Sequence, residues 1–419
     1  MLRFPRPWSF ALLCAAGSAA ACQLILPFDG YAGGGGAETG SPADAGTARK
    51  DATTDAHDAS NPRSDARADR QSTPDAAQDA AADSCSSDAS CGSCGHSCLG
   101  GSCLDGGCQP LTLDPGNAHG AFDLAIDDAS VYWTDNVVGS VNYVLKSGAS
   151  KGSLTGENAP YVTGVTTGAG RVYFASNAGY VGSCPATGCG GGNAQETFIT
   201  KDGGDLRGVV ASGNYLYWAD ETIDGGLSAV VGGALDGGAF SRLATYPAHQ
   251  LQQFIAADDA SVYWAQDDKL FSCPLAGCAG AVVTVAAGSY PHEIAPSAPS
   301  VYFTTVATGA STLQYCGSSS GCASPATLYS SSVDTFGGVA IDAMYVYWTS
   351  SPSVDAGASG PGGQILRCPR SATSNCTPTV LAANEYRPDH IAVDDTAVYW
   401  AATSLDPSSG TLPIRKLAK

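Results

Sequence analysis

The chain has 419 residues, and its 39 Asp and Glu residues against 20 Lys and Arg residues give a formal net charge of −19. This charge argues against a nucleic-acid-binding protein and against adhesion to anionic lipid through a basic patch. Sixteen cysteines are too many for a reducing compartment unless they bind metal, so we predict an oxidising environment outside the cytoplasm.

Residues 1–21 have the pattern of an export signal. Two arginines precede a short apolar stretch, which is followed by small residues and Cys22. The apolar stretch is too short for a membrane-spanning helix, which needs about 20 apolar residues. Residues 19–22 (AAAC) resemble a bacterial lipobox, and this resemblance implies that Cys22 is acylated and becomes the mature N-terminus. Ordinary cleavage, which would give a secreted or periplasmic protein, is the alternative.

Cysteine parity and the residue after Cys22 bear on this choice. Loss of Cys14 with the signal and acylation of Cys22 would leave 14 cysteines, an even number that can pair completely. Gln23 stands where an aspartate retains lipoproteins in the inner membrane, so we expect the outer membrane of a bacterial envelope. Attachment to the membrane is expected through this lipid only.

Residues 22–84 form the predicted linker between the lipid and the folded part. From Gly30 to Ser84 the chain is mainly Ala, Asp, Gly, Ser, Thr and Pro, with Tyr31 as the single aromatic residue. Such a segment buries too little apolar surface to offset the entropy of ordering, and its composition therefore predicts disorder. A flexible linker of about 60 residues spans roughly 45 Å, which would hold the folded part away from the membrane.

Residues 85–110 contain six cysteines at short and fairly even spacings: Cys85, Cys91, Cys94, Cys98, Cys103 and Cys108. Zinc sites usually have two close pairs separated by a longer loop. We therefore predict three disulfides among these six cysteines, with zinc binding that includes His96 as the alternative. Their connectivity is open, because six cysteines can pair in many ways.

Residues 111–419 carry one pattern seven times: an apolar strand, a turn, and a triplet of an aliphatic residue, Tyr and Trp or Phe. The triplets begin at Val131, Val172, Leu216, Val262, Val301, Val346 and Val398. Their spacing of 39 to 52 residues is the length of a four-stranded propeller blade. Each triplet is apolar on both faces of its strand, which is typical of a sheet packed between two neighbours. The pattern predicts an all-β fold, a seven-bladed β-propeller, with six blades as the alternative.

Three further features of the repeat have structural interpretations. Aspartates before the triplets, as in DDASVYW at 127–133 and 258–264, are expected to bond the backbone of the turn. The last repeat ends after its third strand, and the segment CQPLTLDPG (108–116) is expected to supply the fourth strand and close the ring. Close cysteine pairs after the third strand of four blades predict disulfides: Cys184–Cys189, Cys273–Cys278, Cys316–Cys322 and Cys368–Cys376.

Residues 132–135 spell YWTD, and the repeat around them resembles the YWTD propellers of low-density-lipoprotein-receptor-type proteins. It is also similar to NHL-type and gluconolactonase-like propellers. The combination of lipobox, Asp/Ala-rich linker, cysteine-rich segment and VYW repeats resembles secreted lipoproteins of myxobacterial type. These resemblances imply the propeller fold and a location in the cell envelope, and they imply no particular activity.

The positions eight and nine residues before each triplet are expected at the mouth of the central channel, where propellers usually bind ligands. Six of these residues are ionisable: Asp123, Arg207, His292, Glu293, Asp389 and His390. We predict a monomeric binding platform for a small ligand or a cell-envelope protein, with no catalytic residues and no cofactor. The alternative is a metal-dependent, gluconolactonase-like hydrolase or lyase in which the two histidines and neighbouring carboxylates hold a divalent ion.

Overall fold

The computed structural model describes most of the chain after residue 86. The described residues are 87–93, 95–117, 121–155, 161–189, 196–200, 204–223, 227–235, 239–247, 251–275, 277–278, 282–307, 310–353, 362–402 and 412–419. The predicted export signal, Cys22 and the linker lie outside the described residues. Within the described part, no helix is long and apolar enough to cross a membrane.

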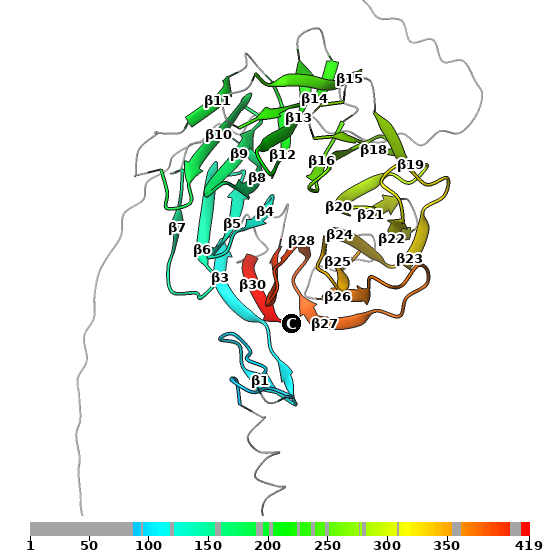
Figure 1. Cartoon of the computed structure of the whole chain (residues 1–419). Helices are drawn as coiled ribbons and strands as arrows, with labels where there is room; N and C mark the ends of the chain where they lie inside the picture. Colours follow the sequence, from blue (N-terminus) through cyan, green and yellow to red (C-terminus); the bar gives the residue numbers. More distant parts are fainter. Residues whose placement is uncertain are drawn as a thin grey trace, which may run out of the picture. The chain divides into compact units, whose positions relative to one another are not determined.

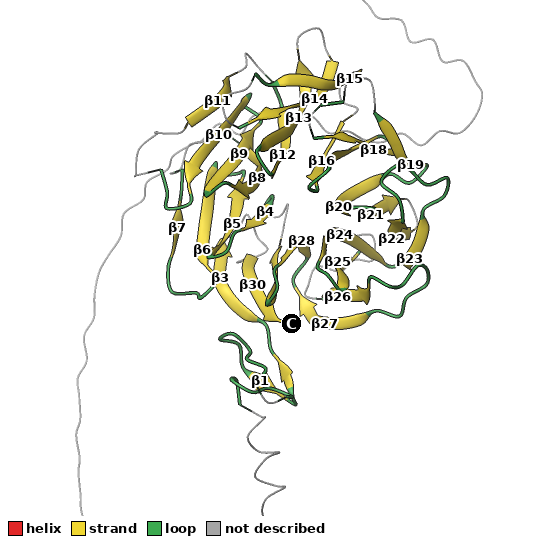
Figure 2. Ribbon diagram, viewed as in Figure 1, coloured by secondary structure: helices red, strands yellow, loops and turns green. Residues whose placement is uncertain are grey.

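The described residues form seven four-stranded antiparallel sheets and one two-stranded sheet, and every described residue lies in a strand or a loop (Figure 2). The four-stranded sheets are numbered as blades 1 to 7 in chain order. Blade 1 is β4 (Leu124–Ile126), β5 (Ser130–Asp135), β6 (Ser140–Leu145) and β7 (Lys151–Ser153). Blade 2 is β8 (Val162–Gly168), β9 (Arg171–Ser176), β10 (Tyr180–Pro185) and β11 (Glu196–Thr200), and blade 3 is β12 (Leu206–Ser212), β13 (Tyr215–Ile223), β14 (Leu227–Ala234) and β15 (Ser241–Pro247).

The remaining blades repeat this order. Blade 4 is β16 (Leu251–Ala257), β17 (Ser261–Gln266), β18 (Lys269–Pro274) and β19 (Val283–Ala287), and blade 5 is β20 (Pro291–Ser297), β21 (Ser300–Ala307), β22 (Ala310–Cys316) and β23 (Ala326–Ser331). Blade 6 is β24 (Asp334–Ile341), β25 (Tyr345–Pro352), β26 (Gly363–Pro369) and β27 (Thr379–Glu385). Blade 7 is β28 (Pro388–Val393), β29 (Ala397–Ala402), β30 (Leu412–Ala418) and β3 (Leu111–Asn117).

The seven blades close into a ring. The innermost strands of consecutive blades contact each other, and β28 of blade 7 contacts β4 of blade 1 (Figure 1). Blade 7 is completed by β3, which comes from the N-terminal side of the repeat and pairs Leu111 with Lys416 and Thr112 with Arg415. The predicted seven-bladed propeller and its closure by the segment around β3 are confirmed, and the six-bladed alternative is wrong.

The triplets lie on the second strand of each blade and form the packing between blades. Tyr263 and Trp264 of blade 4, whose side chains lie on opposite faces of β17, are both 0% exposed. Tyr132 of blade 1 belongs to one buried cluster with Val165 and Phe174 of blade 2. The apolar core is therefore divided among the interfaces between blades, which explains why the triplets are apolar on both faces.

Four of the turns between first and second strands are held by an aspartate. Oδ1 of Asp127 accepts hydrogen bonds from the backbone N–H groups two and three residues ahead, at 2.9 and 2.8 Å. Its Oδ2 accepts a hydrogen bond from the Tyr132 hydroxyl at 2.8 Å. Blades 4, 6 and 7 repeat these three contacts with Asp258, Asp342 and Asp394. The first aspartate of DDASVYW is thus a turn residue that also holds the triplet tyrosine.

Two of these aspartates also connect neighbouring blades. Lys146 Nζ of blade 1 lies 2.6 Å from Asp394 Oδ2 of blade 7. Lys419 Nζ, at the end of blade 7, lies 2.6 Å from Asp342 Oδ2 of blade 6. The two ion pairs flank blade 7, the blade in which two distant segments of the chain meet.

The structure forms the four disulfides expected within blades 2, 4, 5 and 6: Cys184–Cys189, Cys273–Cys278, Cys316–Cys322 and Cys368–Cys376. Each closes the connection between the third and fourth strands of its blade. Blade 3 has no cysteine at this place, and its sequence there contains Asp236-Gly237. Multiple disulfides indicate an extracellular or periplasmic environment.

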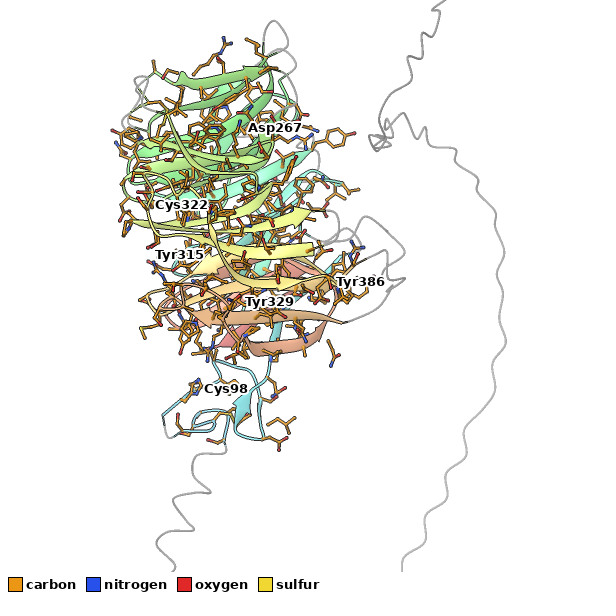
Figure 3. The ribbon with its side chains drawn as sticks, turned by 90° about the vertical axis from the view of Figure 1, so that its right-hand side faces the viewer. Cys98, Asp267, Tyr315, Cys322, Tyr329 and Tyr386 are labelled. Carbon is orange, nitrogen blue, oxygen red and sulfur yellow. A yellow bond between two sulfur atoms is a disulfide. The ribbon has the colours of Figure 1, made fainter. Side chains whose placement is uncertain are left out.

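The cysteine-rich segment adjoins blade 7, and Figure 3 labels Cys98 within it. It contains the short strands β1 (Cys103–Leu104) and β2 (Gly107–Cys108). Two disulfides, Cys91–Cys103 and Cys98–Cys108, cross-link it, while Cys85 and Cys94 lie outside the described residues. Lys416 Nζ of blade 7 donates a hydrogen bond to the Leu99 carbonyl at 3.3 Å, which ties the segment to the closing blade.

Candidate functional site

The innermost strands all begin at the same face of the propeller, and we call the opening of the central channel on this face the mouth. Figure 3 shows Tyr386, in the loop that leads into β28, on the side opposite to Cys322, which follows a third strand. In blades 2 to 7 the pairing of the first strand with the second shifts register near this end. Such a bulge turns side chains out of their regular alternation. The bulges therefore allow side chains at the starts of these strands to face the mouth.

Five of the six ionisable residues expected at the mouth form one electrostatic cluster, which we call the mouth cluster: Asp123, His292, Glu293, Asp389 and His390. They come from blade 1, blade 5 and blade 7. His390 Nδ1 lies 3.7 Å from Glu293 Oε1, and His390 Nε2 lies 3.8 Å from Asp389 Oδ2. His390 is the centre of the cluster, because all three carboxyl groups act on it.

Arg207, the sixth residue, has other partners. Its guanidinium lies 3.0 Å from Asp205 Oδ2 and 3.5 Å from Glu221 Oε2, both within blade 3. These two carboxylates already balance its charge, so the structure does not join Arg207 to the mouth cluster.

Glycines in blade 6 leave the space in which blades 5 and 7 meet. Gly337 and Gly338 occupy the positions that hold His292 and Glu293 in blade 5. A Cβ atom at Gly337 would lie 2.4 Å from Asp389 Oδ1, and one at Gly338 would lie 2.6 Å from the Asp389 carbonyl oxygen. Because blade 6 has no side chain at either position, side chains from two non-adjacent blades approach each other there.

Two threonines hold the backbone of this sector in place. The Thr304 hydroxyl of blade 5 accepts a hydrogen bond from Glu293 N at 3.2 Å and donates one to the Gly337 carbonyl of blade 6 at 2.8 Å. The Thr349 hydroxyl of blade 6 donates to the Asp389 carbonyl of blade 7 at 2.9 Å. This chain of contacts fixes Glu293 and Asp389 relative to each other across blade 6.

Burial dominates the electrostatics of the carboxyl groups. It raises the pKa of Glu293 to about 8, with His390 opposing the shift and Asp123 and Asp389 adding to it. Burial also raises the pKa of Asp123, although His390 and hydrogen bonds from the Val165 and Leu124 N–H groups oppose this effect. Desolvation disfavours the charged form of a carboxyl group. The effect of His390 opposes desolvation at both residues but does not offset it, so both pKa values stay raised.

The two histidines of the cluster differ in charge state. Burial works against a charged His390, but Asp389, Glu293 and Asp123 together raise its pKa above the ordinary value. Burial lowers the pKa of His292, whose ring packs at a tilt of 42° against the Phe254 ring of blade 4, with ring centroids 4.3 Å apart. Among the described residues His292 Nδ1 is buried and has no hydrogen-bond partner. The neighbouring carboxyl groups thus favour the charged form of His390, whereas burial favours the neutral form of His292, a ring with an unused nitrogen.

The spacing of the cluster does not fit a resident divalent ion. In the described part of the chain, three donor atoms of His, Cys, Asp or Glu lie within 4.8 Å of one another only at Cys91, Cys98 and Cys103. Those three sulfurs belong to disulfides, which do not bind metal ions. In the mouth cluster the carboxyl oxygens stand apart around the His390 ring.

Sequence reasoning did not identify the rim of the mouth. Tyr161, Tyr290 and Arg387 stand eleven residues before their triplets, and all three have positive φ values of 51°, 45° and 37°. The Tyr161 and Tyr290 side chains are 59% and 58% exposed. Left-handed backbone is uncommon for residues other than glycine and is enriched at functional sites. A possible signal was the parallel between YPHEI at 290–294 and YRPDHI at 386–391, the segments that carry four of the five cluster residues.

Comparison with known proteins identifies the fold. No protein-family model matches the sequence, and no curated protein matches it. Among solved structures, a streptogramin B lyase superposes with a TM-score of 0.54 at 12% identity, covering 74% of this chain and 98% of that chain. A virginiamycin B lyase from Staphylococcus aureus gives 0.53 at 12% identity, with coverage of 74% and 98%. U3-55K gives 0.55 at 10% identity, also with 74% and 98% coverage.

At these identities the likeness shows the fold and nothing about activity. The chain is similar to β-propeller proteins. The solved structures cover about three quarters of it, the share that the seven repeats occupy.

Proposed function

We propose that the chain is an exported lipoprotein of the myxobacterial type suggested by its sequence, and that its propeller binds a ligand at the mouth cluster. Cys22 would carry the lipid and attach the protein to the outer membrane of the bacterial envelope. The linker would hold the propeller, as a monomer, away from the membrane. The disulfides support an environment outside the cytoplasm, and the ligand would be a small molecule or a group on an envelope protein.

The observation that carries this proposal is the convergence of the mouth cluster. Partly buried ionisable groups that lack sufficient counter-charge destabilise a fold, so they are more often functional than structural. The structural aspartates of this protein show the contrast, because Asp127 has hydrogen bonds to both carboxyl oxygens. Glu293 has instead a neighbouring imidazole at 3.7 Å and a pKa raised to about 8.

The binding role is tested by thermal-shift measurements on the exported chain with a panel of sugars, organic anions, organic amines and divalent cations. We expect one class to raise the unfolding temperature of the wild type and to lose this effect in a Glu293→Gln/Asp389→Asn double variant. The exposed Asp395→Asn variant is the matched control. Stabilisation that persists in the double variant would place the binding site elsewhere. A panel without any stabilising class would contradict the proposal.

The lipid anchor has a separate test. Metabolic labelling with a fatty acid should mark the wild type and not the Cys22→Ala variant in a bacterial host that processes lipoproteins. Equal labelling of both proteins, or of neither, would contradict the anchor while leaving the mouth cluster untouched.

A second candidate function is a hydrolase or lyase that uses the same mouth. It is supported by Glu293, whose pKa of about 8 lies in the range useful for proton transfer, next to His390. The metal-dependent form of this candidate has less support, since the donor atoms do not gather around one point. Its test is product formation from esters and lactones with and without added Mg²⁺, compared between the wild type and His390→Gln.

A further inference from the structure

We propose that the ligand of the mouth cluster is an organic ammonium ion with an apolar group attached. The ammonium group would lie among the carboxyl groups of blades 1, 5 and 7, and the apolar group would lie on the exposed aromatic rim. This inference rests on the proposed function and adds to it the chemical class of the ligand.

Charge is the first argument. Three carboxyl groups, Asp123, Glu293 and Asp389, surround one imidazole, His390, and all three favour its charged form. Arg207 is paired within blade 3 and adds no second positive charge to the cluster. One imidazolium offsets at most one of three carboxylate charges, so a ligand that brings a positive charge would reduce the excess of negative charge that ionisation of the cluster creates, whereas an anionic ligand would add to it.

The unused nitrogen of His292 is the second and independent argument. His292 Nδ1 is buried, and no described residue donates to it or accepts from it. Burial keeps this ring neutral, and a neutral imidazole has one nitrogen that accepts a hydrogen bond. A buried polar atom without a partner costs free energy unless a bound molecule satisfies it. A primary ammonium group has N–H donors for the unprotonated nitrogen of this imidazole and for a neighbouring carboxylate.

Spacing argues against a divalent metal ion as the ligand. Divalent ions draw their oxygen and nitrogen ligands to about 2.0 to 2.6 Å from one centre. Glu293 Oε1 lies 3.7 Å from Nδ1 of the His390 ring, and Asp389 Oδ2 lies 3.8 Å from Nε2 of the same ring. No three ligand atoms of the described cluster come within 4.8 Å of one another.

The rim indicates the second part of the ligand. Tyr290 is 58% exposed only three residues before Glu293, and Val333, in the loop that leads into blade 6, is 65% exposed. Tyr161, 59% exposed, stands at the corresponding place in blade 2. Tyrosine faces attract cations and also pack well against apolar groups. The rim therefore fits a ligand in which an apolar chain or ring is linked to the ammonium group.

Isothermal titration calorimetry with three matched probes tests this inference. The probes are 2-phenylethylamine, which is cationic, 2-phenylethanol, which is neutral, and phenylacetate, which is anionic. We expect the exported chain to bind the amine at least about tenfold more tightly than the alcohol, the difference that one charge-assisted hydrogen bond supplies. Phenylacetate should bind more weakly than either.

Variants locate the binding. Asp389→Asn, which keeps the shape of the side chain, should weaken amine binding by about tenfold or more and leave the binding of the alcohol unchanged. Tyr290→Ala should weaken both by a few-fold. The Asp395→Asn variant, in a turn remote from the mouth, should bind as the wild type does. A parallel titration with N-acetyl-lysine amide distinguishes a free amine from a lysine side chain of a protein as the source of the ammonium group.

Two outcomes would overturn the inference. One is equal binding of the amine and the alcohol, and the other is amine binding that Asp389→Asn leaves unchanged. If an anion, a sugar or a divalent ion binds in an Asp389-dependent manner instead, the proposed function stands and the ligand class is wrong. If no probe binds and the thermal-shift panel also finds no ligand, both the inference and the proposed function fail.

Discussion

Replacement of Glu293 by Gln should make the propeller more stable at alkaline pH and leave it nearly unchanged at acid pH. In the folded chain the pKa of Glu293 is raised from its ordinary 4.5 to about 8. Between these values the unfolded chain releases a proton that the folded chain retains, so the stability of the wild type falls as the pH rises from about 4.5 to about 8. Glutamine does not titrate and therefore avoids this loss.

The size of the effect follows from the pKa and the exposure. A pKa raised from 4.5 to about 8 corresponds to at most about 5 kcal/mol. The side chain retains 24% exposure, and water at the mouth screens part of the interaction, so we expect about 2 kcal/mol above pH 8. The difference between variant and wild type should approach zero below about pH 4, where glutamate is mostly protonated in both states.

Urea unfolding followed by tryptophan fluorescence at pH 5 and pH 8.5 measures this difference, because the triplet tryptophans are buried in the fold. The Asp395→Asn variant, an acid-to-amide change at an exposed residue, is the matched control. An equal change in unfolding free energy at both pH values, or a Glu293→Gln variant less stable than the wild type at pH 8.5, would refute the reasoning.

Three further predictions concern the scaffold. Gly337→Ala should lower the free energy of unfolding, as measured with urea, by about 1 to 3 kcal/mol, since its Cβ would lie 2.4 Å from Asp389 Oδ1. The control is Gly107→Ala, whose Cβ would have its nearest atom at 3.6 Å and which should leave the stability unchanged. Asp342→Asn should cost about 1 to 2 kcal/mol at pH 7 and much less at pH 2. Although burial opposes it, Lys419 and Tyr347 hold the pKa of Asp342 at about 2, so this stability is lost as the pH falls from about 4 to 2; a loss that is independent of pH would contradict the ion pair. The double variant Cys273→Ser/Cys278→Ser should lose at most about 2 kcal/mol of unfolding free energy. Urea unfolding measures this loss, with the oxidised and the reduced wild type for comparison, and reductant should have no effect at this site in the double variant.

The fold could be predicted because the same sequence pattern occurs in all seven repeats. Each triplet is apolar on both faces, and only packing between two neighbouring sheets satisfies that pattern, so seven triplets indicated seven blades. The closing strand could be predicted as well, since a blade of three strands leaves an unpaired edge that β3 covers through its pairing with β30. Both predictions follow from the repeat pattern itself and do not depend on which distant side chains meet.

The site could be predicted only in part. Counting back from the triplets placed Asp123, Glu293 and His390 at one end of the ring, because position within a blade is a property of the repeat. Whether two side chains meet depends on what lies between them, and blade 6 has glycines there. The same count also selected Arg207, whose long side chain donates hydrogen bonds to Asp205, two residues before it. A repeat pattern gives positions but not the choice of partner.

The two kinds of acidic residue in this propeller separate scaffold from function. Aspartates that recur in the same place, such as Asp342 and Asp394, have their carboxyl groups filled with hydrogen bonds, and these bonds lower their pKa values. The acids of the mouth occur at positions where the repeats disagree, and burial raises the pKa values of Asp123 and Glu293. A fold gains stability from the first kind and loses it with the second. Because blades 2, 3 and 6 place glycine where blades 1, 5 and 7 place an ionisable residue, the ring has lost its symmetry in one sector. A ligand that supplies the missing charge there would recover the stability that the sequence gives up.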